Sequence, residues 1–552
     1  MKTQKKLSVV FGLLLVTSLM LVACQPEIVE VVKEVPVEQI VEKVVEVEAE
    51  KVVVAGEVPV GGTLVAGALS GMEPGTLNPN FQRDDGALRV AALVYCQLVA
   101  TDYTHGTGVY PDLADSWDVS DDATEVTFNL VNNATWHDGE AVTSADVVWS
   151  LNEQIDKDGA AVGYLSGVSS IEAPDEHTVK ITLTEPDAAF VTGLGHFYGP
   201  KILPAHLYEG TDWSTNPHNE NPVGCGPFKL TEWVKGSHID FEANLDYHRG
   251  RPALDRFVMR FYVMESLISA FETGDVKYSY DNLPISETVR LQKNPKYTIP
   301  VNPIPLVYWF GFNFAEAPFD DVRVRQAFAH AIDRKDISER AFQGILKPTW
   351  GAMPRGWAYN AEAETAYNPQ LAIELLEEAG FTADADGIRM KVLLSTAAVM
   401  GFPDAIAVMQ EHLKAVGIET TVESFDWAGY VEKVIEQRDF VVGFGGGLAG
   451  PDPSAFEPFV MTDGYRNFMG YSNTRVDELF AQARTSGDIA TRQKAYYEIQ
   501  EILIEEVPRI TFLDSSSYFP RWAEVKNVYF DKAMIGRPGN MDYSFLYAYL
   551  DE

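Results

Sequence analysis

The stretch of this sequence that says most about the fold reads Phe319-Asp320-Asp321-Val322-Arg323-Val324-Arg325-Gln326-Ala327-Phe328, and it continues to Ala331-Ile332-Asp333-Arg334. An aspartate can accept the free amide hydrogens of a first helical turn, so one of the two adjacent aspartates is expected to cap a helix. Asp333 is expected to cap the next helix. Arg323 and Arg325 are expected to be structural ion-pair partners, because an unpaired buried charge is unfavourable. Four apolar residues share one face of the first helix: Val324, Ala327, Phe328 and Ala331.

Other segments predict a body that mixes strands with amphipathic helices. Apolar residues that alternate or run together predict strands, and apolar residues at helical spacing predict helices, two of which stop before Gly380 and Gly417. The expected strands cover residues 63–69, 125–130 and 177–183, and the expected helices cover 144–152, 370–379, 405–416 and 491–505. Such a mixture indicates α/β lobes.

The length and composition exclude several classes of protein. A chain of 552 residues predicts three or four domains or two large lobes, and 46% hydrophobic residues are enough to form cores. The 80 acidic and 43 basic residues give a net charge of −37, which disfavours nucleic-acid partners. Three cysteines are too few for a disulfide scaffold or a Cys-rich metal site.

The N-terminus predicts export and a lipid anchor. Lysines precede an apolar run at residues 7–20, and Leu21-Val22-Ala23-Cys24 resembles the lipobox of bacterial lipoproteins. Residues 1–23 are therefore expected to be a lipoprotein signal peptide, and Cys24 the lipidated first residue of an extracytoplasmic protein held to the membrane by its lipid alone. The alternative is an N-terminal anchor helix with an incidental cysteine. Residues 24–57 carry Glu at every fourth position with many valines, which predicts an extended tether, with a self-associating coiled stalk as the alternative.

Several blocks in order resemble one protein family. They are residues 110–122, 136–148, 224–228, 244–250 and 319–334. Together they are similar to the solute-binding proteins of dipeptide, oligopeptide and nickel ABC importers, family 5 of the extracytoplasmic binding proteins, over about residues 61–513. The resemblance implies an α/β, two-lobed fold of the periplasmic-binding-protein type II-like class, in the large form with an extra subdomain and a hinged cleft.

The resemblance also implies domain limits and a function. The first lobe is expected at residues 58–303, with the extra subdomain at about 90–210, the second lobe at 304–510, and a return to the first lobe at 511–552. The protein is expected to be a monomer without cofactor that captures a small polar ligand, a peptide or an oligosaccharide, and delivers it to ABC permease subunits.

The sequence offers no strong sign of an enzyme. The ten histidines lack metal-ligand spacing, and there is no Gly-x-Ser-x-Gly motif, so no metal site is expected. Residues 136–140 resemble a metal motif only superficially, and Asp138-Gly139 is expected to form a hairpin turn. Because carboxylate pairs are available at every spacing, an extracytoplasmic hydrolase acting on oligosaccharide or peptide stays as an alternative, as does a sensor that presents its ligand.

The ligand site of the family falls on residues that lack its charged groups. Peptide-binding members pair the ligand's amino group with an Asp, and that position is Ala449 here, beside Gly447. The family's nearby Trp and Arg fall on Gly446 and Gly443. The glycine run is expected to leave a wider cavity, which favours a sugar or a neutral solute. Asp452 is retained, either as a ligand contact or as a turn cap.

Further ligand contacts are implied by the resemblance. Trp427 matches the family's cleft tryptophan and is expected to stack on the ligand. The other expected contacts are Tyr308, Trp309, Asp84, Asp85 and Tyr164; a core position is the alternative for Trp309.

Two cysteines remain after lipidation of Cys24. Cys96 and Cys225 are expected either to form a disulfide in the oxidising compartment or to be two buried free thiols.

Overall fold

The computed structural model describes residues 59–81, 84–101, 109–398, 402–448, 450, 452–528, 545–546 and 548–551. The predicted signal peptide, Cys24, the tether and Ala449 lie outside the described residues and stay predictions. Within the described ranges, no helix has both the length and the apolar composition that crossing a membrane requires.

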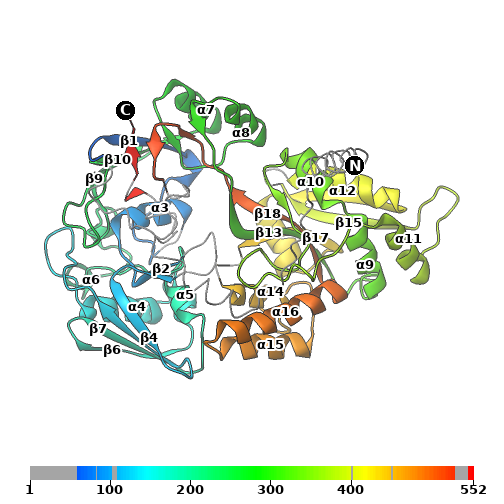
Figure 1. Cartoon of the computed structure of the whole chain (residues 1–552), viewed down its shortest axis with the longest axis horizontal. Helices are drawn as coiled ribbons and strands as arrows, with labels where there is room; N and C mark the ends of the chain where they lie inside the picture. The colour runs from blue at the N-terminus through cyan, green and yellow to red at the C-terminus, as the bar shows by residue number, and fades with distance from the viewer. Residues whose placement is uncertain are drawn as a thin grey trace, which may run out of the picture. The chain divides into compact units, whose positions relative to one another are not determined.

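A seven-stranded mixed sheet forms the base of the first lobe (Figure 1). Its strands, in spatial order, are β12 (Tyr297–Thr298), β19 (Arg521–Trp522), β11 (Tyr278–Ser279), β1 (Thr63–Leu69), β10 (Arg256–Tyr262), β9 (His238–Ala243) and β8 (Phe228–Val234). β1 pairs in parallel with β10 and β11, as strands joined by helical crossovers do. The helices of this lobe include α3 (Asp85–Val94), α7 (Met264–Thr273) and α8 (Ile285–Gln292).

A four-stranded antiparallel sheet forms a separate subdomain of the first lobe. Its order is β4 (Ala114–Val119), β5 (Glu125–Leu130), β7 (Thr178–Leu183) and β6 (Val168–Asp175), and α4 (Ser144–Asp156), α5 (Phe190–Leu194) and α6 (Ala205–Tyr208) accompany it. α4 begins at a capping box between Thr143 and Asp146. Along β7 every second residue is buried, so alternation predicted this strand correctly.

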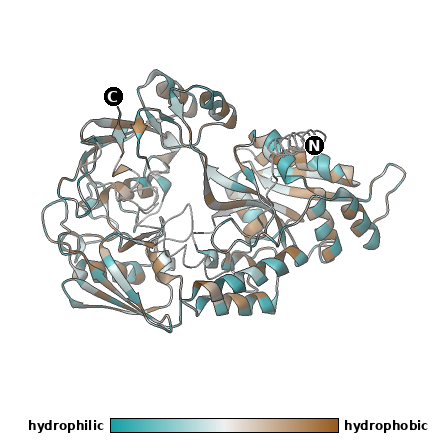
Figure 2. Ribbon diagram, viewed as in Figure 1, coloured by the Kyte–Doolittle hydropathy of each residue, from teal (hydrophilic) through white to brown (hydrophobic). Residues whose placement is uncertain are grey.

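A six-stranded sheet forms the second lobe. Its order is β14 (Lys347–Pro348), β18 (Arg509–Ser517), β13 (Asn302–Phe312), β17 (Val442–Leu448), β15 (Met390–Ala397) and β16 (Ile418–Phe425). Residues of α9 (Val322–Ala331), α10 (Arg334–Phe342), α11 (Pro369–Glu378) and α12 (Phe402–Ala415) share one hydrophobic core with it. Residues of α14 (Glu457–Val460), α15 (Thr474–Arg484) and α16 (Ile489–Glu506) share another. Figure 2 shows α15 and α16 carrying both hydrophilic and hydrophobic residues, as helices with one buried face do.

The segment from Phe319 to Arg334 folds as predicted. The Asp321 side chain accepts a hydrogen bond from the Arg323 amide and caps α9, and the Asp333 side chain accepts from the Lys335 amide and caps α10. Arg323 pairs with Asp321 at 2.6 Å. Arg325 is buried and donates to the carbonyl oxygens of Glu506, Val507 and Phe319. Both arginines are structural; the buried one binds carbonyl oxygens rather than a carboxylate.

The strand β18 changes one expected domain boundary. A return to the first lobe was expected at residue 511, but this position lies inside β18, which pairs with β13 of the second lobe. All nine residues of β18 are buried, so the strand belongs to the second-lobe sheet throughout. The chain rejoins the first sheet at β19. Two short pairs complete the described strands: β2 (Val99–Thr101) with β3 (Val109–Pro111), and β20 (Val525–Lys526) with β21 (Tyr549–Leu550).

Candidate functional site

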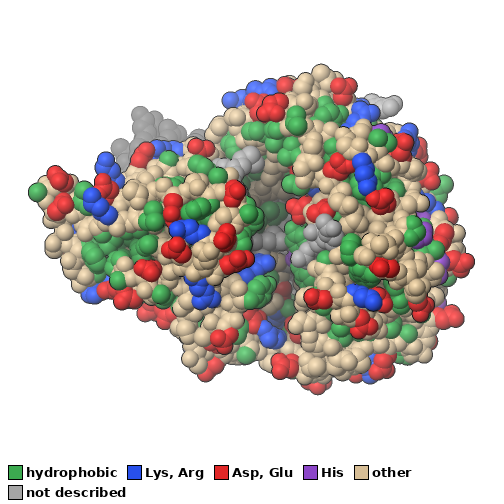
Figure 3. All heavy atoms as spheres, turned by 180° about the vertical axis from the view of Figure 1, so that it is seen from behind, with side chains coloured by type: hydrophobic (Ala, Val, Ile, Leu, Met, Phe, Trp, Pro, Cys, Tyr) green, Lys and Arg blue, Asp and Glu red, His purple; other side chains and the backbone are tan. Residues whose placement is uncertain are grey.

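A pocket of about 830 Å³ lies between the subdomain of the first lobe and the second lobe. Residues 160–198 supply one wall, and residues 450–484 supply the other. The space-filling view in Figure 3 shows the body hollowed between its two halves. A ligand in this pocket would touch both lobes, which is the arrangement that lets a ligand favour a closed state.

The first-lobe wall is a short stack of aromatic rings. The Tyr164 and His196 ring centroids are 4.9 Å apart, and those of His196 and Tyr198 are 5.5 Å apart. The Tyr198 amide donates to His196 Nδ1 at 3.0 Å, and the Tyr164 hydroxyl lies 2.9 Å from the same nitrogen. These bonds make Nδ1 of His196 a hydrogen-bond acceptor. The stack offers a flat apolar surface with polar edges.

Charged groups of both signs line the pocket. Acidic side chains come from Glu185, Asp187, Asp452 and Glu457, and basic ones from Arg466 and Arg484. Glu457 pairs with Arg484. Burial raises the pKa of Asp187 above its ordinary value, and Arg484 offsets only part of that rise. Asp187 would therefore gain from a further cationic partner.

Asp452 lines the pocket but its carboxylate already has partners. Its Oδ1 accepts a hydrogen bond from the Ser454 amide and caps the following turn. The same oxygen pairs with Arg492 at 2.7 Å, and both side chains are buried. Of the two roles that the sequence allowed for Asp452, the structure shows the turn cap. The ion pair with Arg492 was not indicated by the sequence.

At Gly443, Gly445 and Gly446 the glycine run of β17 does not open the expected cavity, so the expectation was wrong at these three positions. A Cβ atom on Gly445 would lie 2.7 Å from Cζ2 of Trp309. A Cβ on Gly446 would lie 3.1 Å from Tyr308, and one on Gly443 would lie 3.2 Å from Phe440. Neighbouring aromatic rings fill the space that the absent side chains leave. The glycines allow these rings to approach the strand.

The expected contacts Trp309 and Tyr308 belong to cores of the second lobe. Trp309 is 2% exposed and packs against Phe468, so the prediction of a ligand contact is corrected to the alternative of a core aromatic. Tyr308 is partly buried on the opposite face of the sheet, where it packs against Phe402. Its hydroxyl lies 3.4 Å from Ser515 Oγ, and burial raises its pKa. The period of two along β13 separates these adjacent residues.

Trp427 lies at the surface rather than in this pocket. It is the first residue of α13 (Trp427–Tyr430), its side chain is 56% exposed, and its ring stacks on Tyr430 with centroids 6.1 Å apart. It is absent from the lining described above. Its role as a ligand contact stays a prediction.

The two aspartates at the start of α3 have different positions. Asp84 caps the helix by accepting from the Ala87 amide at 2.7 Å, and it also accepts from the Gly75 amide. Asp85 is exposed and accepts a hydrogen bond from the Tyr198 hydroxyl at 3.3 Å, which places it beside the aromatic wall. Gly447 lies in β17 opposite Val307.

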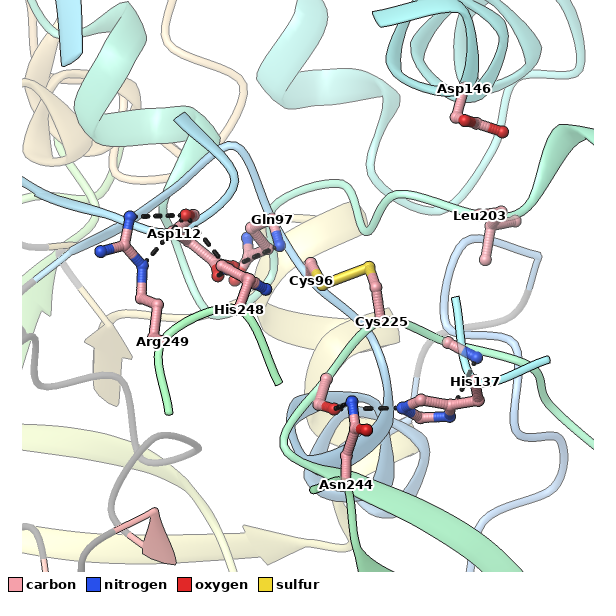
Figure 4. Close-up of a disulfide and its surroundings, with 12 residues drawn as sticks. Cys96, Gln97, Asp112, His137, Asp146, Leu203, Cys225, Asn244, His248 and Arg249 are labelled. Carbon is pink, nitrogen blue, oxygen red and sulfur yellow. Dashed lines mark hydrogen bonds and ion pairs between the residues drawn. A yellow bond between two sulfur atoms is a disulfide. The ribbon is translucent and has the colours of Figure 1, made fainter. Parts of the chain in front are cut away.

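A disulfide joins Cys96 and Cys225 in the first lobe, with their Cα atoms 5.5 Å apart (Figure 4). His137 lies beside the bridge: its Nε2 is 3.0 Å from the Gly226 carbonyl, and the Gly224 amide donates to its Nδ1. Burial lowers the pKa of His137 to about 4, so the ring is neutral near pH 7. Gly139 has φ of 99° and its amide donates to the Trp136 carbonyl, which confirms the predicted turn.

One group of potential metal ligands occurs among the described residues. One ligand atom each from Glu232, His238 and Asp240 lies within 4.8 Å of the others. Asp240 is already paired with Arg256 at 2.6 Å, and the Glu232 side chain is 61% exposed. Nothing further in the structure points to an ion there.

Sequence reasoning missed most of the pocket. Of the predicted contacts that the structure describes, Tyr164 and Asp452 alone are among the lining residues. His196, Tyr198 and Asp187 come from segments without any recognisable motif.

Comparison with known proteins identifies the family. Residues 108–467 match the family described as "Bacterial extracellular solute-binding proteins, family 5 Middle". The chain belongs to this family. This family 5 protein is 28% identical over 494 residues to the oligopeptide-binding protein AppA of Bacillus subtilis, covering 84% of this chain and 88% of AppA. It is 27% identical to heme-binding protein A of Haemophilus influenzae, covering 78% and 84% of the two chains.

The fold comparison agrees. The crystal structure of the ABC transporter substrate-binding protein CtaP of Listeria monocytogenes superposes with a TM-score of 0.80 at 25% identity, covering 89% of this family 5 protein and all of CtaP. The predicted two-lobed α/β fold and the predicted solute-binding function are thereby confirmed, and the relatives are binding proteins rather than enzymes.

Proposed function

We propose that this family 5 protein is a lipid-anchored, monomeric binding subunit that captures short peptides between its lobes and delivers them to an ABC permease. The observation that carries the proposal is the pocket lined by both lobes, with an aromatic wall and charges of both signs. A peptide is zwitterionic and has apolar side chains, so it can use each of these groups. The relatives named as peptide-binding proteins support the same ligand class.

The acid for the peptide's amino group is assigned in this proposal to Asp187. The position that family members use is occupied by Ala449, which carries no charge. Asp187 lines the pocket, and its carboxylate accepts one amide hydrogen bond, from Ala189. Because burial raises its pKa, an ammonium group nearby would be favourable.

The oligosaccharide alternative has lost part of its support. It rested on the missing charged partners at Ala449 and Gly443 and on extra room beside the glycine run, and aromatic rings fill the room at Gly443, Gly445 and Gly446. What remains in its favour is the exposed ring of Trp427 and the stack at Tyr164. A hydrolase stays the second candidate: Asp452 and Glu457 are paired with arginines, but Glu185 and Asp187 also line the pocket, so the turnover assay below has to decide.

Calorimetry tests the ligand class. Di- to pentapeptides, their N-acetylated forms, and cello- and manno-oligosaccharides are titrated into the wild type, Tyr164→Ala and Asp187→Asn. Tyr367→Ala serves as a control, because Tyr367 is exposed and outside the pocket. We expect peptide binding that weakens at least tenfold in both pocket variants and on N-acetylation. Binding of oligosaccharides alone, or release of cleaved product from either substrate class, contradicts the proposal.

The lipid anchor is tested separately. Mass spectrometry of the protein extracted from membranes should find a mature chain that starts at Cys24 with a diacylglyceryl group. An intact chain with an unmodified Cys24 contradicts this part of the proposal.

A further inference from the structure

An arginine lies in the hydrophobic core of the second lobe without an acceptor for its hydrogen bonds. Arg509 is the first residue of β18 and is 5% exposed. Its Nε and Nη2 atoms are buried and have no hydrogen-bond partner. Arginine stays protonated in proteins, and buried N–H groups that lack acceptors are strongly unfavourable. An acceptor is therefore needed at this point of the core.

Aromatic rings surround the guanidinium but cannot serve as that acceptor. Its central carbon lies 3.7 Å from the centre of the Phe456 ring, 5.3 Å from that of Phe459 and 5.5 Å from that of Trp309. These rings stabilise the charge across the flat face of the group. The N–H bonds lie in the plane of the guanidinium, so its edge is left for a ligand.

A second buried arginine lies on the same small cavity. Arg334 is 2% exposed and donates to the Thr511 carbonyl at 2.9 Å and to the Ala329 carbonyl at 3.2 Å. Arg334, Arg509, Thr365 and Thr511 all line the cavity, whose remaining lining is mainly apolar. It has room for a single occupant about as large as a water molecule or a halide ion.

The cavity has positive charge on its walls; Asp333 and Glu364 favour the charged form of Arg334, whereas no carboxylate among the described residues does so for Arg509. Among the described residues, no carboxylate pairs with Arg509 or Arg334, in contrast to Arg492, which pairs with Asp452 in the same lobe. Burial lowers the pKa of Arg509 to about 9 and that of Arg334 to about 10, so both are still charged near pH 7. A buried positive charge without a counter-charge, as at Arg509, is unfavourable in a medium of low dielectric.

From this geometry we infer a structural site for a small inorganic anion, chloride in the extracytoplasmic environment, between Arg509 and Arg334. The anion accepts the in-plane N–H bonds of Arg509 and neutralises its charge. The cavity is too small for a carboxylate-bearing metabolite or a phosphate. The site lies inside the second lobe, so it stabilises the fold and is independent of peptide binding.

Crystallography with bromide tests the site directly. Crystals of the wild-type protein are soaked in sodium bromide, and anomalous data are collected at the bromine absorption edge. We expect an anomalous peak within hydrogen-bonding distance of Arg509 that disappears in Arg509→Met. A cavity without an anomalous peak, filled by a water molecule only, overturns the inference.

Thermal unfolding supplies a second test that does not need crystals. The melting temperature is compared in sodium chloride and in sodium gluconate at equal ionic strength. We expect it to be higher in chloride by about 1–3 °C, because a ligand that binds only the folded state stabilises it. Arg509→Met should remove the difference, and Arg256→Met, which removes an exposed arginine of the first lobe, should keep it. A difference that survives in Arg509→Met counts against the site; if that variant does not fold, the bromide experiment on the wild type decides.

Discussion

The contact between Gly445 and Trp309 gives the sharpest prediction about stability. In Gly445→Ala, the new methyl group would lie 2.7 Å from Cζ2, 2.8 Å from Cη2 and 3.1 Å from Cε2 of the Trp309 ring. Carbon atoms in ordinary contact lie about 3.5–4.0 Å apart, so one methyl group overlaps three ring atoms. The ring has little freedom to move, because it is 2% exposed and packs against Phe468 and the Arg509 guanidinium.

The expected change in the free energy of unfolding of Gly445→Ala is the sum of two opposing effects. Overpacking a rigid core costs about 1–3 kcal/mol. Replacing glycine by alanine also restricts the unfolded chain, which returns about 0.4–1 kcal/mol where the backbone angles suit alanine. The backbone of Gly445 is outside the left-handed region, so this gain applies. The net expectation is a loss of about 1–2 kcal/mol in the free energy of unfolding.

The assay is urea unfolding monitored by circular dichroism, and it includes two comparison variants. Gly356→Ala is the matched control in the same lobe, because its new Cβ would meet nothing within 4 Å. We expect it to stay within about 0.5 kcal/mol of the wild type. In the background Trp309→Leu, Gly445→Ala should cost much less than in the wild type, because the clashing ring is gone. Equal stability of Gly445→Ala and Gly356→Ala would refute the packing role of the glycine. So would a loss of stability from Gly445→Ala that is as large in the Trp309→Leu background as in the wild type.

Three further predictions concern buried charges. Burial raises the pKa of Asp514 from 3.8 to about 6 despite its pairing with Arg355; its contribution to stability is therefore complete below about pH 4 and is lost as the pH rises through 6. Between pH 4 and 7 the free energy of unfolding of the wild type, measured with urea, should fall by about 2–3 kcal/mol more than that of Asp514→Asn. Parallel changes of this free energy with pH in the two proteins would contradict the prediction. For His137, burial lowers the pKa from 6.5 to about 4, so its contribution is complete above pH 6.5 and is lost as the pH falls through 4. Between pH 6.5 and pH 4 the free energy of unfolding of the wild type should fall by about 2–3 kcal/mol more than that of His137→Gln. Identical acid-unfolding midpoints for the two proteins would contradict this prediction. Asp452→Ala leaves Arg492 buried without its partner and should cost about 3–5 kcal/mol in chemical denaturation, whereas a cost below 1 kcal/mol would show that the pair contributes little.

The sequence indicated much of the fold because its signals are local. Asp321 and Asp333 cap helices through bonds within three residues, and the alternation in β7 reflects the two faces of one strand. The boundary at residue 511 was wrong because pairing between β18 and β13 connects residues some two hundred positions apart, and no local pattern shows where that pairing ends.

The site was harder to predict because its contacts are distant in the chain. The glycines of β17 predicted an open cavity only when the strand was considered alone, and the ring of Trp309 that fills the space comes from β13. The aromatic wall joins Tyr164 to His196 and Tyr198, which follow it in the chain only after β6, β7 and α5. Asp452 kept its place in the family pattern, yet Arg492, which decides its role, lies on another helix.

Small-angle X-ray scattering of the protein with and without peptide tests ligand capture between the lobes most directly. The probe is the peptide of two to five residues that binds most tightly in calorimetry, added at saturation, with its N-acetylated form as the control. Peptide capture by lobe closure predicts a smaller radius of gyration with the free peptide and, at the same concentration, a smaller decrease with the acetylated one, which binds more weakly. Unchanged dimensions at saturation would contradict capture by closure of the two lobes.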